Sequence, residues 1–204
     1  MRIDDINTVV PSGDNVVLQI VEPTTEGTLV IPKQNIVDEK NATLITGKVI
    51  SVGATADNPN ACPGVAPGKT YMMNVFGGYH IATKDVKEMY KLLGGYNLLA
   101  ELEDIDNINE STVSPVGYRL LIAQKFVDET QDGLVLTGMD ARDPRLEDLD
   151  YGVVLKVGAS CKLGYEVGQL VGYPPYCGEQ VKSDNGKDSP ALRVLHENDV
   201  ALTA

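Results

Sequence analysis

Short apolar runs separated by polar turns recur along the chain and predict β-strands. The runs are Val16–Ile20 and Val49–Val52 in the first half, and Leu120–Ile122 and Val153–Val157 in the second half. They are rich in branched apolar residues and bounded by glycine or proline. Several short strands of this kind within about a hundred residues predict a small β-barrel.

One segment has helical spacing instead. In KDVKEMYKLLGG, residues 84–95, apolar side chains recur at i, i+3, i+4 and i+7, and a glycine pair closes the segment. The apolar residues are Val86, Met89, Tyr90 and Leu93. The second half has CGEQVKSDNGKD at the corresponding place, so we expect one short helix inserted in the first half. It would pack on its own barrel or contact another subunit.

The patterns repeat in the same order. GKVISVG at 47–53 matches GVVLKVG at 152–158, an offset of 105 residues (152 minus 47). Three further pairs are GDNVVLQI from Gly13 with GYRLLIAQ from Gly117, APGKTYM at 66–72 with EVGQLVG at 166–172, and EDIDNI at 103–108 with LHENDV at 195–200. Because the order is kept while the offset shrinks at loops, we expect a tandem duplication.

The chain is therefore expected to be all-β, with two tandem small barrels. The first covers residues 1–108 and the second residues 109–204, with a short polar joint near 107–115. The 204 residues fit two domains of this size. An apolar fraction of 43% is enough for packed cores, although Trp is absent.

Two apolar triplets lie apart from the predicted strands. Leu29, Val30 and Ile31 follow Gly27 in EGTLVIP, and Leu134, Val135 and Leu136 lie between Gly133 and Gly138 in DGLVLTG. Strongly charged stretches flank the second triplet. Exposed apolar clusters are unfavourable unless something covers them. Each triplet is therefore either a strand of its barrel or a contact point for a partner.

These motifs, in this order and twice over, resemble the GroES-like co-chaperonin family, whose members are lids of chaperonin rings. The second unit follows the family pattern with DGLVLTG, YGVVLKVG, YEVGQLV and HENDVAL. The first unit follows it with EGTLVIP, TGKVISVG, APGKTYM and EDIDNI. The match spans nearly the whole chain.

The resemblance implies that each barrel carries a long mobile loop whose tripeptide docks on the apical domain of a GroEL-like chaperonin. The chaperonin-binding residues would then be the two triplets, with Gly27, Gly133 and Gly138 as loop glycines. We expect residues 22–46 and 127–150 to be poorly ordered in the free protein. Burying an aliphatic side chain gains ~1.5–3 kcal/mol, and ordering a loop residue costs ~1–2 kcal/mol, so each contact is weak and the ring binds through multivalency.

The resemblance also implies a ring oligomer in which the first and closing strands of neighbouring barrels pair. Such pairing hides edges that would otherwise invite aggregation. The candidate interface residues are Val9, Val10, Val200, Ala201 and Leu202. The number of chains per ring, and whether both barrels of a chain lie in one layer, stay open.

The chain departs from the family at the roof hairpin. Only ATADNPNACPGV in the first unit and ASCKLG in the second stand at that place. Both are too short for a full hairpin, so the roof would be shortened or missing. This truncation and the divergence between the copies resemble phage-type co-chaperonins, whereas the tandem layout resembles the double-domain lid of chloroplasts.

Charge and cysteine usage narrow the partners. A net charge of −12 repels nucleic acid and anionic membrane surfaces, and no apolar run is long enough to span a membrane. No signal or transit peptide is visible. Cys62, Cys161 and Cys177 are expected to be free thiols in a reducing cytosol, which would be the host cytoplasm if a phage encodes the protein.

Three motifs that could suggest an enzyme are set aside. GVAPGKT at 64–70 has too few residues between its glycines for a phosphate-binding loop, and Pro67 removes an amide. His80 and His196 have no His or Cys at metal-ligand spacing. The dehydrogenases that share the barrel need a G-x-G-x-x-G motif, which is missing. We expect no catalytic residues, metal or cofactor.

The leading hypothesis is a non-enzymatic co-chaperonin that closes a chaperonin cavity while a substrate folds inside. The ATPase activity would belong to the partner. The alternative is a structural or decoration protein of the virion type that has kept the fold. Two apolar triplets in polar flanks favour the first hypothesis, because a decoration protein has no use for them.

Overall fold

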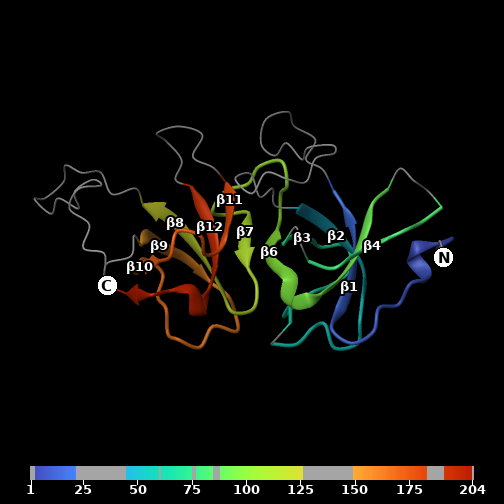
Figure 1. The fold of residues 1–204 in the computed structure, drawn as a ribbon, viewed down its shortest axis with the longest axis horizontal. Coiled ribbons are helices and arrows are strands. Elements are labelled where there is room, and N and C mark those ends of the chain that lie inside the picture. Colours follow the sequence, from blue (N-terminus) through green and yellow to red (C-terminus); the bar gives the residue numbers. More distant parts are fainter. Residues whose placement is uncertain are drawn as a thin grey trace, which may run out of the picture.

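A computed structural model describes residues 3–21, 45–59, 61–74, 77–84, 88–125, 149–182 and 191–203. These residues form two antiparallel sheets that lie side by side along the long axis of the molecule (Figure 1). The N- and C-termini lie at opposite ends of that axis.

The first sheet has seven strands in the order β4-β5-β1-β2-β3-β6-β7. Their bounds are β1 (Asn15–Ile20), β2 (Ile45–Val52), β3 (Thr70–Met73), β4 (Tyr79–Ile81), β5 (Tyr90–Gly94), β6 (Leu98–Leu102) and β7 (Val113–Pro115).

The second sheet has six strands in the order β11-β12-β8-β9-β10-β13. Their bounds are β8 (Arg119–Lys125), β9 (Asp150–Val157), β10 (Leu170–Tyr173), β11 (Glu179–Lys182), β12 (Leu192–His196) and β13 (Leu202–Thr203). Short 3-10 helices are η1 (Ile6–Thr8), η2 (Gly95–Asn97) and η3 (Glu197–Asp199).

Alternation along the strands separates an inner from an outer apolar face. In β1, Val16 and Leu18 join the core of the first barrel, whereas Val17 between them joins an outer cluster with Ile6 and Tyr90. In β8, Leu120 and Ile122 join the core of the second barrel. Side chains on a strand alternate between its faces. Apolar residues on both faces of a strand therefore indicate apolar contacts on the outside of the barrel as well as in its core.

The strand orders are consistent with the predicted duplication. β4, β5, β1, β2, β3 and β6 of the first barrel correspond in order to β11, β12, β8, β9, β10 and β13 of the second. Even the irregularities repeat, because the β1–β2 register shifts after Val17 and the β8–β9 register shifts after Leu121. Left-handed glycines also occur in pairs, namely Gly13 and Gly117, Gly64 and Gly164, Gly68 and Gly168, and Gly78 and Gly178.

The predicted helix is wrong. Residues 90–94 form β5, which pairs with β1 and β4, and no α-helix occurs in the described part of residues 84–95. The segment is the counterpart of β12 rather than an insertion. Tyr90 and Leu92 face the outer cluster while Leu93 faces the core. Because apolar side chains lie on both faces of the strand, they do not alternate with polar ones, and they imitate helical spacing.

The sequence alignment of the two ends is also wrong. In β6, Ala100 pairs with Met72, and in β13, Leu202 pairs with Gly172. Since the strands β3 and β10 differ by 100 residues, the closing segments differ by 102 residues (202 minus 100). Residues 93–98, and not 103–108, are therefore the counterpart of residues 195–200.

The expected loss of the roof hairpin is confirmed for the described residues. The connections between β2 and β3 and between β9 and β10 consist of turns and bends, with no strand in residues 53–59, 61–69 and 158–169.

The joint between the two units is a strand exchange. β7 follows the predicted boundary at residue 108 but pairs with β6 of the first sheet. Val116, directly after β7, packs in the core of the first barrel. The division into residues 1–108 and 109–204 stays a prediction. In the described ranges no helix is long and apolar enough to cross a membrane.

Candidate functional site: loop bases and the barrel junction

Both predicted chaperonin-binding triplets lie outside the described residues, as do Gly27, Gly133 and Gly138. Their attachment points are described. Residues 22–44 connect Val21 to β2, and residues 126–148 connect β8 to Leu149. Ile20 pairs with Gly47, and Gln124 pairs with Gly152. Each triplet therefore lies in a segment inserted between two paired antiparallel strands, at the same position in both barrels.

Polar contacts fix both attachment points. In the first barrel, the backbone N–H of Val21 donates to Thr46 O at 3.0 Å, and the buried Thr46 hydroxyl donates to Val21 O. In the second, Gln124 Nε2 donates to Asp150 Oδ2 at 3.3 Å. These bonds hold the two ends of each segment together, so the segments leave from rigid strands.

The junction between the barrels is built on the pairing of β6 with β7. Its register joins Ala100 to Pro115, Glu101 to Ser114, and Leu102 to Val113. A mixed apolar cluster covers the junction. Its buried members are Met72, Leu99, Ala100, Leu102, Ile108, Val113, Leu121, Val181, Leu192 and Val194.

Further contacts join the barrels at the ends of the junction. The Ser160 hydroxyl donates to Pro59 O at 2.7 Å, and the Lys156 ammonium donates to Val113 O at 2.8 Å. Arg119 Nη2 donates to Tyr96 O. Because these bonds link residues on both sides of β6–β7, the two barrels have a specific mutual orientation.

The segment before β1 is the first-barrel counterpart of β7. TVVPSG at 8–13 matches TVSPVG at 112–117, with Val10 in place of Ser114 and Ser12 in place of Val116. The turns before both segments also match, because the side chain of Asp5 accepts from Asn7 N–H and that of Asn109 accepts from Ser111 N–H. This short repeat is the sequence signal that could have predicted the role of β7.

The anchoring of the two segments is also similar. Val9 O accepts a hydrogen bond from the Ser51 hydroxyl at 2.8 Å, as Val113 O does from Lys156. Yet β7 has a partner strand, whereas Val10 stands 83% exposed. Residues 9–11 thus have anchoring contacts like those of β7 but, within the described part of the chain, no paired strand.

The outer apolar surface of each barrel is called here its docking face. In the first barrel it consists of Val9, Val17, Ile50, Tyr90 and Leu92. Its counterpart in the second barrel consists of Val113, Leu121, Leu155, Leu192 and Val194. The second docking face lies in the junction cluster, whereas the first is covered by Ile6, which is only 8% exposed. Ile6 was not among the predicted site residues.

The predicted interface residues belong to different barrels, with Val9 in the outer cluster of the first and Val200 against the core of the second. Val9 is half-buried and Val10 is exposed. Val200 packs against the core of the second barrel, while Ala201 and Leu202 are exposed, Leu202 to 38%. Figure 1 shows the N- and C-termini at opposite ends of the long axis.

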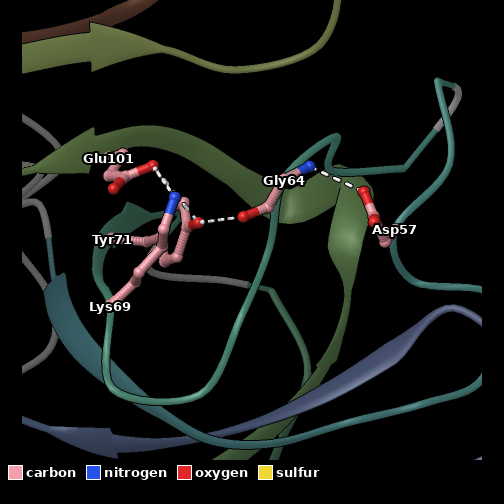
Figure 2. A network of polar contacts seen from close by, with 5 residues as sticks. All are labelled: Asp57, Gly64, Lys69, Tyr71 and Glu101. Atoms are coloured by element: carbon pink, nitrogen blue, oxygen red, sulfur yellow. Dashed lines mark hydrogen bonds and ion pairs between the residues drawn. The ribbon is translucent and has the colours of Figure 1, made fainter.

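The motif GVAPGKT lies in a polar network (Figure 2). The Gly64 N–H donates to Asp57 Oδ1 at 2.7 Å, and the Lys69 ammonium lies 2.9 Å from Glu101 Oε2. The Tyr71 hydroxyl lies 3.5 Å from Gly64 O, and burial raises its pKa. The Gly64 amide and the Lys69 ammonium, which would hold a phosphate, therefore bind the carboxylates of Asp57 and Glu101 instead. The network also connects the shortened roof segment to β6.

A different contact set braces the second roof connection. The Glu197 carboxylate accepts from the backbone N–H groups of Lys162 and Leu163 at 2.8 and 3.2 Å. His196 Nδ1 accepts from Asn198 N–H and so caps η3. Across the described residues, no three His, Cys, Asp or Glu side chains gather as metal ligands would.

Comparison with known proteins agrees with the strand order. Residues 8–102 match the family model described as the chaperonin 10 kDa subunit, a stretch that begins before β1 and ends with β6. No curated protein matches the chain. The second barrel repeats the strand order of the matched region. The first barrel thus matches the GroES-like chaperonin-10 family of co-chaperonins over 95 of the 204 residues of the chain (102 minus 8, plus 1).

Proposed function

We propose that the protein caps a chaperonin ring by inserting its two apolar triplets into the apical domains of the chaperonin. The observation that carries the proposal is the family match, combined with the identical placement of both triplet-bearing segments between paired strands. The lid itself would be non-enzymatic, and the partner would hydrolyse ATP. The protein would work in the cytoplasm, with its three cysteines as free thiols.

We further propose that chains assemble head to tail, with residues 9–11 of one chain paired to the closing strand of the next. The junction inside the chain supports this, because β7 makes that contact with β6. The free ends are available for it, since Val10 and Leu202 are exposed and the two termini of the chain lie at opposite ends of the molecule. Both barrels of a chain would then be neighbours in a single layer.

Substitution of the triplet Leu134, Val135 and Leu136 by serine tests the capping proposal. Capping of a GroEL-type chaperonin, followed by native mass measurement with nucleotide, should be lost or strongly reduced, because each missing contact is multiplied around the ring. The free energy of unfolding should stay unchanged.

The same substitution at Leu29, Val30 and Ile31 shows whether the first loop also docks. A smaller effect is expected there, because Pro32 restricts the backbone directly after the triplet. If either variant instead loses several kcal/mol of stability, as buried residues would, the triplet belongs to a core. Unchanged capping by a variant with both triplets replaced would favour the decoration-protein alternative.

A further inference from the structure

Two side chains of the second barrel carry buried polar atoms that have no hydrogen-bond partner. Tyr173, the last residue of β10, is fully buried, and its hydroxyl is one of them. The other is the Nε of Arg193 on β12. No other buried side-chain nitrogen or oxygen in the described residues lacks a partner. Because buried polar groups are nearly always hydrogen-bonded, these two call for an explanation.

The two atoms belong to one side-chain pair. The guanidinium of Arg193 lies over the ring of Tyr173, with 5.6 Å between Cζ and the ring centroid. Its Nη1 donates to Pro175 O at 3.0 Å and to Cys177 O at 2.7 Å. These bonds fix the guanidinium against the turn that precedes β11 and leave the buried Nε–H without an acceptor.

Both unpartnered groups are donors. Burial raises the pKa of the Tyr173 hydroxyl to about 12, although Arg193 opposes this shift. The hydroxyl therefore keeps its proton at neutral pH. The Nε–H of an arginine donates and cannot accept. The pair thus lacks an acceptor, and one oxygen atom could serve both donors.

The charge of Arg193 indicates that the acceptor is an anion. The partners of Nη1 are neutral carbonyls, and among the described residues Arg193 forms no salt bridge. Glu179 lies near enough for Arg193 to oppose the burial that raises its pKa, but its carboxylate accepts from Asn74 Nδ2 at 3.4 Å. Charges that are removed from water are normally paired. A water molecule would accept the two hydrogen bonds and leave the charge unpaired.

The first barrel does not have this pair. Met73 stands at the position of Tyr173, since Met73 pairs with Ile45 and Tyr173 pairs with Asp150, each the first residue of its strand. Lys91 stands at the position of Arg193, and its ammonium donates to Gly77 O. The fold is therefore built without unpartnered donors in one barrel, so packing alone does not explain them in the other.

The pair lies at the base of the second triplet-bearing segment. Asp150, the register partner of Tyr173, begins β9 directly after that segment, and its carboxylate accepts from Gln124 on β8. Arg193 pairs in register with Ile122 of the same strand β8. The unpartnered donors therefore belong to the end of the barrel at which residues 126–148 are attached.

We infer that Tyr173 and Arg193 form a binding site for a small oxyanion of the carboxylate or phosphate class at the base of the second segment. One oxygen of the anion accepts from the Tyr173 hydroxyl and from the Arg193 Nε–H, and its charge pairs with the guanidinium. Arginine binds both classes of anion through its planar set of donors. The site does not depend on the proposed capping.

Calorimetric titration of the full chain with sodium acetate, and separately with sodium phosphate, tests the site in a chloride buffer of matched ionic strength. The anion that fits should bind with saturation at one site per chain. At a hundredfold excess over its Kd it should raise the melting temperature by about 5 °C.

Tyr173→Phe is the main variant, because it keeps the ring beneath Arg193 and removes one donor. It should weaken binding by about tenfold, as expected for loss of a hydrogen bond to a charged group. Without added anion it should melt at or above the wild-type temperature, because an unsatisfied buried hydroxyl has been removed. A structural role of the hydroxyl would lower that temperature instead.

Two further variants complete the comparison. Arg193→Lys introduces the residue that the first barrel has at this position and removes the Nε donor, so binding should again fall at least tenfold. Tyr165→Phe is the matched control. The Tyr165 hydroxyl donates to Glu197 O at 2.9 Å in the second roof connection, so this variant should melt lower and bind the anion with unchanged affinity.

Three results would overturn the inference. The first is the absence of saturable binding of either anion by the wild type. The second is unchanged affinity in Tyr173→Phe, which would mean an adventitious ion only. The third is a lower melting temperature of Tyr173→Phe without anion, which would mean that the hydroxyl already has a partner such as a buried water. None of them bears on capping, which the triplet variants test separately.

Discussion

At the scale of single residues, a repeated glycine pair makes very close approaches to the backbone. A Cβ added to Gly53 would lie 2.3 Å from Gly13 O, and one added to Gly158 would lie 2.5 Å from Gly117 O. Both contacts are with backbone atoms, which cannot rotate away. Only glycine fits where the start of each barrel passes over its first hairpin.

Alanine at Gly53 or Gly158 should therefore lower the free energy of unfolding by ~3 kcal/mol or more, since the backbone must shift to relieve overpacking. Gly64→Ala is the matched control, because nothing lies within 4 Å of its Cβ and only its φ of 76° is strained. That strain costs ~1–2 kcal/mol. Urea unfolding measures all three, and equal losses would contradict the steric explanation.

A second prediction at this scale concerns the buried thiol of Cys62. Burial raises its pKa from the ordinary 9.0 to about 12. Between these values the folded protein keeps a proton that the unfolded chain releases, so stability falls as pH rises from 9 towards 12.

Cys62→Ala should remove part of this loss of stability at high pH. Melting temperatures recorded between pH 8 and 11 should fall less steeply for Cys62→Ala than for the wild type. Burial likewise raises the pKa of Cys161, to about 11, so some loss will remain in the variant. Parallel curves for the variant and the wild type would exclude a contribution from Cys62.

At the scale of elements, a cationic side chain ties the fifth strand of each barrel to the preceding turn. Lys91 on β5 is 3% exposed, and its ammonium donates to Gly77 O at 2.8 Å. Arg193 on β12 occupies the same register position and donates to Cys177 O at 2.7 Å. The two side chains differ, but the contact with the turn is kept.

Lys91→Met should cost ~1–3 kcal/mol, because the aliphatic stem is retained while Gly77 O loses a charged donor. Lys48→Met, at an exposed position of β2, is the control and should change stability by less than about 0.5 kcal/mol. Chemical denaturation compares the two. An unchanged Lys91→Met variant would mean that the contact with the turn contributes nothing to stability.

Strands that appear in the sequence as uninterrupted or alternating runs of branched apolar residues were predictable from local pattern. The runs that form β1, β2, β8 and β9 are of this kind. The repeat offsets also predicted which glycines of the two barrels correspond. β5 was not predictable, because Tyr90 and Leu92 pack against Ile6 and against residues far away in sequence. β7 was not either, since three residues reveal no strand until their partner β6 is known.

At the scale of the whole molecule, the free ends should control association. Val10→Asp places a charge at a position that is 83% exposed in the single chain, so the fold should be retained. At a head-to-tail junction the same charge would be desolvated without a partner. Sedimentation should then show single chains at micromolar concentrations where the wild type forms larger particles. Asn7→Asp, exposed on the neighbouring turn, should behave like the wild type.

The candidate chaperonin contact itself was predictable only from the family resemblance. The triplets differ from strands by their polar flanks, which local pattern alone leaves ambiguous. Their proposed function depends on a partner surface that no residue of this chain encodes. In contrast, the proposed assembly contact has a counterpart within the chain, because the pairing of β6 with β7 provides a template for it.

The exchange of β7 onto the first barrel has a kinetic consequence. A lid built from separate barrels needs one bimolecular encounter for each junction, and each encounter costs translational and rotational freedom. Here every second junction is closed while a single polypeptide folds, at an effective concentration set by residues 103–112. In the proposed head-to-tail assembly, lid formation would therefore need half as many encounters as separate barrels would, and a closed lid would hold an even number of barrels.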